Sequence, residues 1–258
     1  MQNHTNFVAN RFIDDPSAET FAVLNPATAT PFATVQLASL ATAELAVQSA
    51  VNAHGAWKRL PAIERARALQ RLANALERHA PAIGVSLAQE SGKSLADACA
   101  EVGYGAEIVR YHAEWARRIE GEIIPSDNPR EQLFLHREPI GVVVCLIPFN
   151  FPIYTLLRKI APALITGNTV VVRPSNSTPV SALVLAQAVG EAELPDGVVS
   201  ILAMDHAVCA ALCQQPGVGM MTLTGSVAAG RQIMGYAQTH IAKTSLELGG
   251  KTPAIVAA

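Results

Sequence analysis

The spacing of the hydrophobic positions changes near the middle of the chain. Over residues 42–120 apolar side chains recur at three- and four-residue intervals, as in Leu69, Leu72, Ala73 and Leu76. This spacing places them on one face of an amphipathic helix. We therefore expect the region to be helical.

A longer helix in the same region separates apolar from charged residues. Its apolar face holds Leu95, Ala98, Cys99, Val102, Ala106 and Val109. The opposite face holds Glu101, Arg110, Glu114, Arg117 and Arg118. Such charged faces are typically solvated, so we interpret this one as exposed and structural.

From Gly141 onward, short apolar runs alternate with helical segments. The strands are expected at Val142–Ile147, Thr169–Arg173, Val198–Leu202, Met220–Thr224 and Lys243–Leu246. The helices between them are expected at Ile153–Leu164, Val180–Ala192, Ala207–Gln214 and Ala228–Thr239. Continuous apolar strands are typical of a parallel sheet buried on both faces. The pattern predicts a doubly wound α/β sheet, whose ligands bind at the carboxyl ends of the strands.

Two other segments have the pattern of hairpins. Residues 1–40 are rich in turn residues, and Phe21–Leu24 is predicted to be a hairpin strand. Residues 121–140 contain two short apolar runs, Glu122–Ile124 and Leu133–His136, around a Pro- and Asn-containing turn. The second hairpin is too apolar to stand alone in water, so we expect it to dock on another surface.

Composition and charge exclude several classes of protein. Half of the residues are hydrophobic, which is incompatible with a disordered chain. The formal net charge of −2 gives no basic excess for nucleic acid or an anionic membrane surface. No apolar run has the length of a membrane span, and the polar N-terminus is unlike a secretory signal.

The four cysteines predict neither a metal site nor a disulfide framework. Cys99, Cys145, Cys209 and Cys213 include no CxxC pair, and no His lies at zinc-ligand spacing from them. We interpret all four as core residues, with no His or cation near them to form a thiolate. A reducing cytoplasm is the simplest setting.

An Asn follows the first predicted strand of the sheet. Asn150 lies between Pro148 and Pro152, whose rings stiffen the loop. Its carboxamide could donate a hydrogen bond to a developing oxyanion. It could equally cap the following helix. Both interpretations stay open from this segment alone.

Two other strand ends carry residues suited to a nucleotide. Arg173 is followed by small polar residues that could bind a ribose or phosphate, although Ser177 and Thr178 also suit an ordinary helix start. Gly225 and Ser226 precede a helix whose N–H groups could bind a phosphate. Neither a P-loop nor a G-x-G-x-x-G fingerprint is present.

A carboxylate follows the last predicted strand. Glu247 stands just before Gly249 and Gly250, where it is a candidate general base. The alternative is a surface Glu paired with Lys251.

These strand-end segments, taken in order, resemble the NAD(P)-dependent aldehyde dehydrogenase superfamily. The matching segments are Pro148–Pro152, Ala161–Leu164, Gly167–Thr169, Arg173–Ser175, Thr224–Ser226 and Leu246–Lys251, with Asn25–Thr28 and Glu90–Lys93 upstream. Residues 113–124 are most similar to the lactaldehyde/glycolaldehyde dehydrogenase branch.

The resemblance implies a mechanism and a set of site residues. A cysteine thiolate attacks the aldehyde, Asn150 helps to hold the oxyanion, hydride passes to the nicotinamide, and Glu247 activates the water that hydrolyses the thioester. The implied cofactor-binding residues are Ile147, Pro148, Phe149, Asn150, Arg173, Ser175, Asn176, Thr224, Gly225, Ser226, Glu247, Leu248 and Gly249. Arg158 and Phe151 are implied at the substrate mouth, with an aldehyde, such as lactaldehyde, as substrate.

The resemblance also implies a division of the chain. Residues 1–120 and 140–250 would form a Rossmann-like cofactor-binding domain, residues 121–139 a β-hairpin oligomerisation arm, and residues 251–258 the start of a catalytic domain. The nucleophilic Cys of the family lies beyond the Glu that matches Glu247, and none of the four cysteines takes its motif position. We therefore expect a fragment that is inactive by itself and forms a homo-oligomer when complete.

Three alternatives stay open. The cofactor is NAD or NADP: Asn176 stands where NAD-preferring members carry Glu, and Arg173 can pair with a 2′-phosphate. The substrate could belong to another branch, such as betaine aldehyde or a semialdehyde. The chain could also be a stand-alone dinucleotide-binding module, or the non-functional product of a frameshifted gene.

Overall fold

A seven-stranded mixed sheet forms the centre of the computed structural model, which describes residues 2–256. The strand order is β12-β11-β8-β9-β10-β2-β3. The parallel strands are β8 (Val142–Leu146), β9 (Thr169–Arg173), β10 (Val199–Ile201), β11 (Val218–Gly225) and β12 (Lys243–Leu248). Strands β2 (Asn6–Val8) and β3 (Arg11–Ile13) extend the β10 edge in antiparallel orientation.

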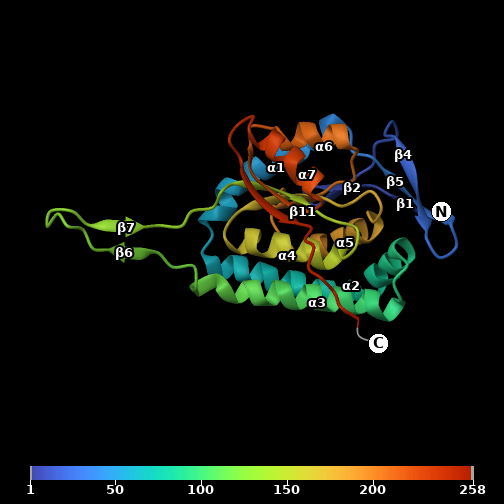
Figure 1. The fold of residues 1–258 in the computed structure, drawn as a ribbon, viewed down its shortest axis with the longest axis horizontal. Coiled ribbons are helices and arrows are strands. Elements are labelled where there is room, and N and C mark those ends of the chain that lie inside the picture. The colour runs from blue at the N-terminus through green and yellow to red at the C-terminus, as the bar shows by residue number, and fades with distance from the viewer. Residues whose placement is uncertain (1, 257–258) are drawn as a thin grey trace.

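Helices cover both faces of this sheet (Figure 1). One face packs on α4 (Pro152–Ile165) and α5 (Val180–Glu191), and the other on α1 (Leu40–Arg59), α6 (His206–Cys213) and α7 (Val227–Ala237). Alternate side chains of a strand point to opposite faces. Val143 and Cys145 accordingly join the α4–α5 core, while Val142 and Val144 join the other. The doubly wound α/β prediction is confirmed.

The strand order reverses between β8 and β11. The chain runs from β8 outward to β9 and β10, and then returns to place β11 and β12 on the other side of β8. Such a reversal opens a crevice at the carboxyl ends of the strands, where ligands bind. The loops after β8, β9, β11 and β12 therefore define the place of a site.

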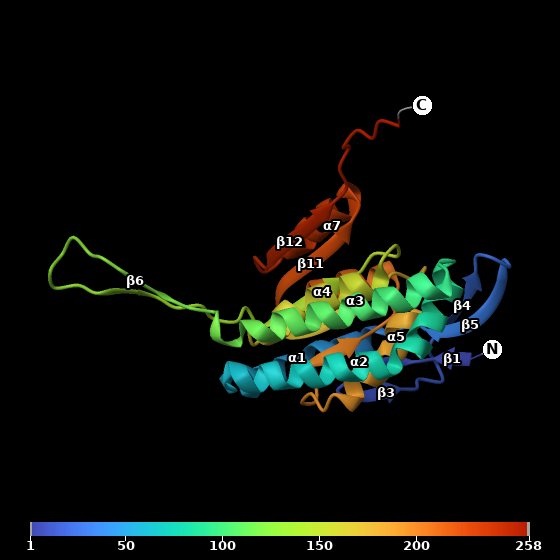
Figure 2. The ribbon, with the colours of Figure 1, turned by 90° about the horizontal axis from the view of Figure 1, so that it is seen from below.

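Two long helices form an outer layer. Helices α2 (Ala62–Ser91) and α3 (Leu95–Ala113) lie side by side and pack against α4 and α5, and the short helix η1 (Glu114–Arg117) follows α3 (Figure 2). The helical periodicity is confirmed, but the solvated charged face is wrong at one position. Glu101 is 3% exposed. Its carboxylate reaches α4 instead of water.

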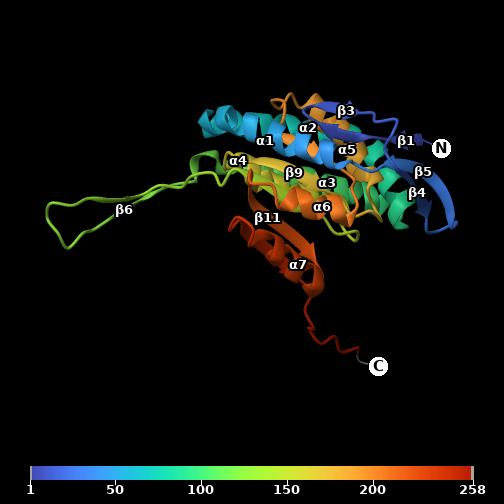
Figure 3. The same cartoon turned by 90° about the horizontal axis from the view of Figure 1, so that it is seen from above.

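A hairpin projects from the body. Strands β6 (Glu122–Ile124) and β7 (Leu133–Leu135) pair in antiparallel orientation and extend well beyond the rest of the molecule (Figures 1 and 3). The predicted pair of strands is confirmed. Ile123 is 80% exposed and Phe134 55%, so the apolar side chains of the arm have no cover within the described residues.

The N-terminal segment adds β1 (Gln2–His4), β4 (Thr20–Asn25) and β5 (Thr30–Gln36) as a small separate sheet. Buried Asn6 ties it to the body, since it donates to Gln36 O and accepts from Ala203 N at 2.8 Å.

The outer strands are less buried than the apolar pattern predicted. Strands β8 and β10 are buried throughout, whereas β12 is exposed or half-exposed along its whole length. The reason is its position, because β12 forms the edge of the sheet. No helix in the described part of the chain is long and apolar enough to cross a membrane.

Candidate functional site

The strand register brings the predicted site segments to one end of the sheet. Leu146 at the end of β8 pairs with Arg173 on one side and with Leu223 on the other. Thr224 in turn pairs with Glu247. The loops that begin at Ile147, Pro174, Ser226 and Gly249 therefore leave the sheet on the same side.

The carboxamide of Asn150 is free. Helix α4 begins after Phe151, whose side chain gives no cap, and the first-turn N–H groups of Ile153 and Tyr154 donate to the Glu101 carboxylate at 3.0 and 3.1 Å. Asn150 is exposed and has no hydrogen-bond partner among residues 2–256. The interpretation of Asn150 as a helix cap is wrong for this structure, which leaves the carboxamide available to a ligand.

The helix that follows β9 is also capped by a carboxylate from elsewhere in the chain. Helix α5 has no side-chain cap from its own segment, and its Val180 and Ser181 N–H groups donate to buried Glu90 at 2.7 and 3.1 Å. Helix α5 does start just after Ser177 and Thr178, as their sequence suggested, but neither side chain caps it. Burial raises the pKa of Glu90 to about 8, although these hydrogen bonds work in the opposite direction.

Unpartnered polar atoms gather in this loop. The Arg173 guanidinium donates through Nη2 to Met204 O at 3.3 Å, while its buried Nε has no acceptor in the structure. The buried Asn176 Oδ1 and Thr178 Oγ1 also lack partners. Ser175 Oγ accepts from Ser177 N at 3.2 Å. Buried polar groups are normally hydrogen-bonded, so these atoms fit a polar ligand such as a ribose.

Helix α7 offers a second polar anchor. Ser226 caps it by accepting from Ala229 N at 3.1 Å. The N–H groups of Val227 and Ala228 precede the first helical hydrogen bonds, so they point into the open space after β11. A helix start of this kind attracts a phosphate.

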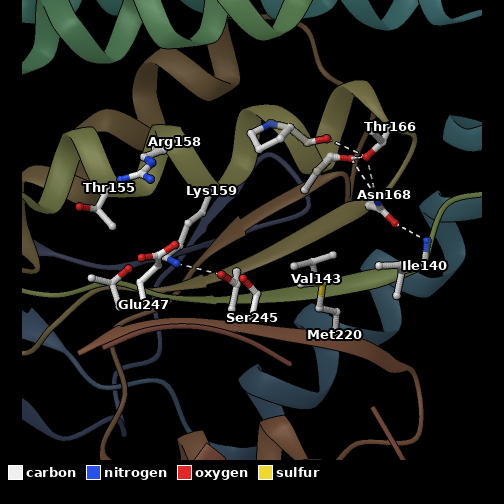
Figure 4. A pocket seen from close by; sticks show the side chains of 14 residues that line it. Ile140, Val143, Thr155, Arg158, Lys159, Thr166, Asn168, Met220, Ser245 and Glu247 are labelled. Atoms are coloured by element: carbon white, nitrogen blue, oxygen red, sulfur yellow. Dashed lines mark hydrogen bonds between the residues drawn. The ribbon is translucent and has the colours of Figure 1, made fainter. Parts of the chain in front are cut away.

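Glu247 lies at one end of a cavity of about 440 Å³ that runs between α4 and strands β11 and β12 as far as Ile140 and Asn168 (Figure 4). Lys159 on α4 points into it toward Glu247, and its Nζ donates to Thr222 Oγ1 at 2.8 Å. Burial lowers the pKa of Lys159, an effect that Glu247 opposes. Glu247 forms no ion pair with Lys251 within the described residues, so that alternative is not supported.

A larger groove of about 920 Å³ runs between α3 and the start of α4. Its lining includes Asn150, Phe151 and Arg158, together with the aromatic residues Tyr104 and Tyr111. The two cavities adjoin, because both are lined by Thr155, Arg158 and Thr224. The structure thus brings the two predicted substrate residues next to Asn150, and Glu247 next to Arg158.

The remaining predicted cofactor residues line neither cavity. Ile147 is buried and its N–H donates to Arg173 O at 3.0 Å. Phe149 is 62% exposed, and Gly249 is open to solvent. Leu248 packs against Gly230, where a Cβ would lie 2.9 Å from Leu248 Cδ2. Arg173, Ser175 and Asn176 lie one strand away, after β9, and line neither cavity.

The cysteines lie outside both cavities. All four are free, and three are buried while Cys99 is partly exposed. The expectation that no cation lies near them is wrong, since Lys159 faces Cys145 and Arg173 faces Cys209 and Cys213. Burial nevertheless raises the pKa of Cys145 to about 12, so this thiol stays protonated. No metal-binding cluster of His, Cys, Asp or Glu is found in residues 2–256.

Sequence reasoning missed three residues of the site: Lys93, Glu101 and Lys159. Lys159 follows Arg158 in a helix that is otherwise largely apolar, which was a usable signal. Glu101 gave no such signal, because its spacing matches that of exposed charges on the same helix.

Comparison with known proteins agrees with this geometry. Residues 12–258 match the model of the aldehyde dehydrogenase family. The chain is 40% identical over 254 residues to lactaldehyde dehydrogenase of Escherichia coli strain K12, which covers 98% of this chain and 53% of that protein. It is 33% identical to D-glyceraldehyde dehydrogenase (NADP(+)) of Thermoplasma acidophilum, covering 97% and 51%.

A solved structure shows the same fold. The structure of 3,6-anhydro-L-galactose dehydrogenase in complex with NAP superposes with a TM-score of 0.92 at 33% identity, covering 96% of this chain and 52% of that one. The fold is a doubly wound α/β sheet with a candidate site at the carboxyl ends of its strands. The chain belongs to the aldehyde dehydrogenase family, and it spans about half the length of the relatives it matches.

Proposed function

We propose that this chain forms the cofactor-binding part of an NAD(P)-dependent aldehyde dehydrogenase that oxidises a small aldehyde to a carboxylic acid. One observation carries the proposal. At the switch point of the sheet, an unpaired carboxamide (Asn150) lines one of two adjoining cavities and a carboxylate (Glu247) lines the other, close to an open helix start at Ser226. Oxidation of an aldehyde to an acid through an acyl intermediate needs an oxyanion donor, a general base for the hydrolysis, and an anchor for the phosphates of the dinucleotide.

Each residue has a role that its surroundings support. The free N–H groups of Asn150 stabilise the oxygen of the aldehyde as it gains negative charge. Glu247 accepts a proton from the water that releases the acid, and Lys159 lines the same cavity. A nicotinamide held at this site would supply the hydride acceptor. A cysteine nucleophile is required, and none of the four cysteines reaches the cavities, so we expect no aldehyde oxidation by this chain alone.

The residues after β9 fit the ribose of the cofactor. Arg173 and Asn176 present the unpartnered buried Nε and Oδ1 atoms, which can bind ribose hydroxyls. No carboxylate stands at Asn176 to repel a 2′-phosphate, and Arg173 can pair with one. Relatives named for NADP(+), or solved with NAP, support NADP as the preferred cofactor.

A titration tests this function directly. We expect isothermal calorimetry to show saturable binding of NADP, weaker binding of NAD, and a loss of about ten-fold or more in NADP affinity for Arg173→Ala, since charge-assisted hydrogen bonds contribute about 1.5–3 kcal/mol. Arg130→Ala in the distant hairpin is the control. Absence of NAD and NADP binding to a demonstrably folded chain would overturn the assignment.

The substrate is proposed to be a small hydroxyaldehyde. The 40% identity to a lactaldehyde dehydrogenase and the position of Arg158 between the two cavities support this choice. Arg158 is exposed to the groove and can bind a hydroxyl or carboxylate next to the aldehyde, while Phe151 supplies an apolar wall.

A stand-alone dinucleotide-binding module is the second candidate, and the location of all four cysteines away from the cavities favours it. The two candidates share the binding of NAD(P) and differ in one respect. Only the first predicts that Asn150 and Glu247 support aldehyde oxidation once a nucleophile is supplied.

We also propose that residues 121–139 form an arm for assembly with further copies of the chain. Ile123 and Phe134 are both more than half exposed on a hairpin that touches little else. Ile123→Asp with Phe134→Asp should therefore shift an oligomer toward the monomer in sedimentation velocity, because charge cannot be buried at an apolar interface without a partner. Arg130→Gln at the tip is the control, and an unchanged distribution of the double variant would contradict this role.

A further inference from the structure

The outer helix pair supplies the caps of α4 and α5, the helices that follow the site loops after β8 and β9. Glu90 at the end of α2 accepts from the first turn of α5, and Glu101 on α3 accepts from the first turn of α4. Neither α4 nor α5 has a side-chain cap from its own segment. The residues that precede α4 and α5 are therefore released from capping.

Every backbone N–H group in the first turn of α4 has a hydrogen-bond acceptor. Pro152 has no N–H, the N–H groups of Ile153 and Tyr154 go to Glu101 Oε1, and Thr155 N donates to Phe151 O at 3.0 Å. No donor of the first turn is left for Asn150. Asn150 stands one residue before the N-cap position, which Phe151 occupies without a side-chain hydrogen bond, and Asn is among the residues best suited to cap a helix.

Lys93 holds the carboxylate in place. Its ammonium forms an ion pair with Glu101 Oε2 and lies 3.9 Å from the centroid of the Phe151 ring. The side chains of Glu101 and Lys93 are 3% and 20% exposed. A buried carboxylate needs such a partner, and Lys93 thereby also contacts the residue that follows Asn150.

The Glu90–Lys93 segment builds this arrangement. Gly92 ends α2 with a φ of +75°, a left-handed conformation that favours glycine. The turn allows Lys93 N to donate to Ser91 Oγ at 3.3 Å and directs Lys93 to Glu101. A four-residue segment far from the sheet thus anchors both site loops.

We propose that Glu101, held by Lys93, is a positioning residue for Asn150: it replaces Asn150 as the cap of α4, so that the carboxamide stays free to meet the nicotinamide end of the cofactor and the aldehyde. The inference rests on the proposed function. It concerns the loop before α4 only, and it predicts no effect on the adenosine end of the cofactor.

The test compares a dinucleotide with its fragment. The dinucleotide that binds more tightly, NAD or NADP, is titrated alongside ADP-ribose or its 2′-phosphate, which lack the nicotinamide. We expect Glu101→Ala to weaken dinucleotide binding by about ten-fold and fragment binding by less than about two-fold. Glu101→Gln keeps one acceptor oxygen for the two N–H groups and should recover affinity to within about three-fold of the original.

A second readout needs no ligand. The side-chain amide signal of Asn150 in a ¹H–¹⁵N spectrum, assigned by its loss in Asn150→Asp, should shift in Glu101→Ala because the carboxamide turns to cap Ile153 and Tyr154. Glu114→Gln, an exposed position at the end of α3, is the matched control and should leave the signal in place. If Glu101→Ala does not fold, Lys93→Met serves instead, with a smaller shift in the same signal.

Three outcomes are distinguishable. Failure of the unmodified chain to bind either dinucleotide or fragment overturns the proposed function, while the Asn150 signal still decides the positioning role. An equal loss of dinucleotide and fragment affinity in Glu101→Ala overturns the positioning role and indicates general stabilisation. An unmoved Asn150 signal in a folded Glu101→Ala chain overturns it as well.

Discussion

A hybrid enzyme that joins this chain to the carboxyl-terminal half of Escherichia coli lactaldehyde dehydrogenase should oxidise lactaldehyde, and Glu247→Gln should lower its turnover by about 10²–10⁴-fold, the usual contribution of a general base. The amide of Gln cannot take a proton from water. Glu247 is suited to this step because it lies in a solvent-open cavity beside the Lys159 ammonium. The rate of lactaldehyde-dependent NADPH or NADH formation is the measurement.

Two further variants of the hybrid make the result specific. Asn150→Ala should lower turnover by about 10²–10³-fold, as expected for one oxyanion donor. Glu114→Gln, at the exposed end of α3, should leave it unchanged. Lactaldehyde oxidation that persists at the full rate in Glu247→Gln would show that another group activates the water and would contradict the role of Glu247.

The second large effect concerns stability and pH. Burial raises the pKa of Glu90 from 4.5 to about 8. Between these two values the folded chain holds a proton that the unfolded chain releases, so stability falls as the pH rises. Glu90 should therefore lower the free energy of unfolding by up to about 4 kcal/mol between pH 5 and pH 8, at about 1.4 kcal/mol per pKa unit.

Other groups titrate in this window, so a difference measurement is needed. Burial lowers the pKa values of His4 and His54, which makes stability rise with pH up to about 6.5 and opposes the effect of Glu90. Urea unfolding of the unmodified chain and of Glu90→Gln at several pH values isolates Glu90. The stability advantage of the unmodified chain should shrink from pH 5 to pH 8, and parallel curves for the two proteins would contradict the raised pKa.

The periodic parts of the fold could be predicted from the sequence. Five parallel strands, four crossover helices and the hairpin at residues 122–135 were found because each repeats a pattern of apolar positions over several residues. Strands β2 and β3 were not predicted. Their place in the sheet depends on the pairing of β2 with β10, more than 190 residues away in the chain.

The site could be predicted where a loop follows a strand. Parallel strands end at one edge of the sheet, so Asn150, Arg173, Ser226 and Glu247 were expected near one another from topology alone. The two adjoining cavities bear this out for Asn150 and Glu247. The nucleotide roles of Arg173 and Ser226 stay predictions, which the titration tests.

The groups that hold the loops could not be predicted. Glu90 and Glu101 act on α5 and α4 across 90 and 52 positions of sequence. On their own helices they have the ordinary spacing of surface charges, as the wrong assignment of Glu101 shows. Only the packing of α2 and α3 against α4 and α5 decides that these carboxylates meet helix N-termini rather than water.

The central claim is that the carboxyl ends of β8, β9, β11 and β12 form one nucleotide site. Hydrogen–deuterium exchange of the chain with and without saturating NADP tests it most directly. We expect slower exchange in four segments, residues 147–151, 173–178, 225–229 and 247–250, while the hairpin at residues 121–139 stays unchanged. Protection confined to other parts of the chain, or no protection at a concentration that saturates binding, would contradict the account.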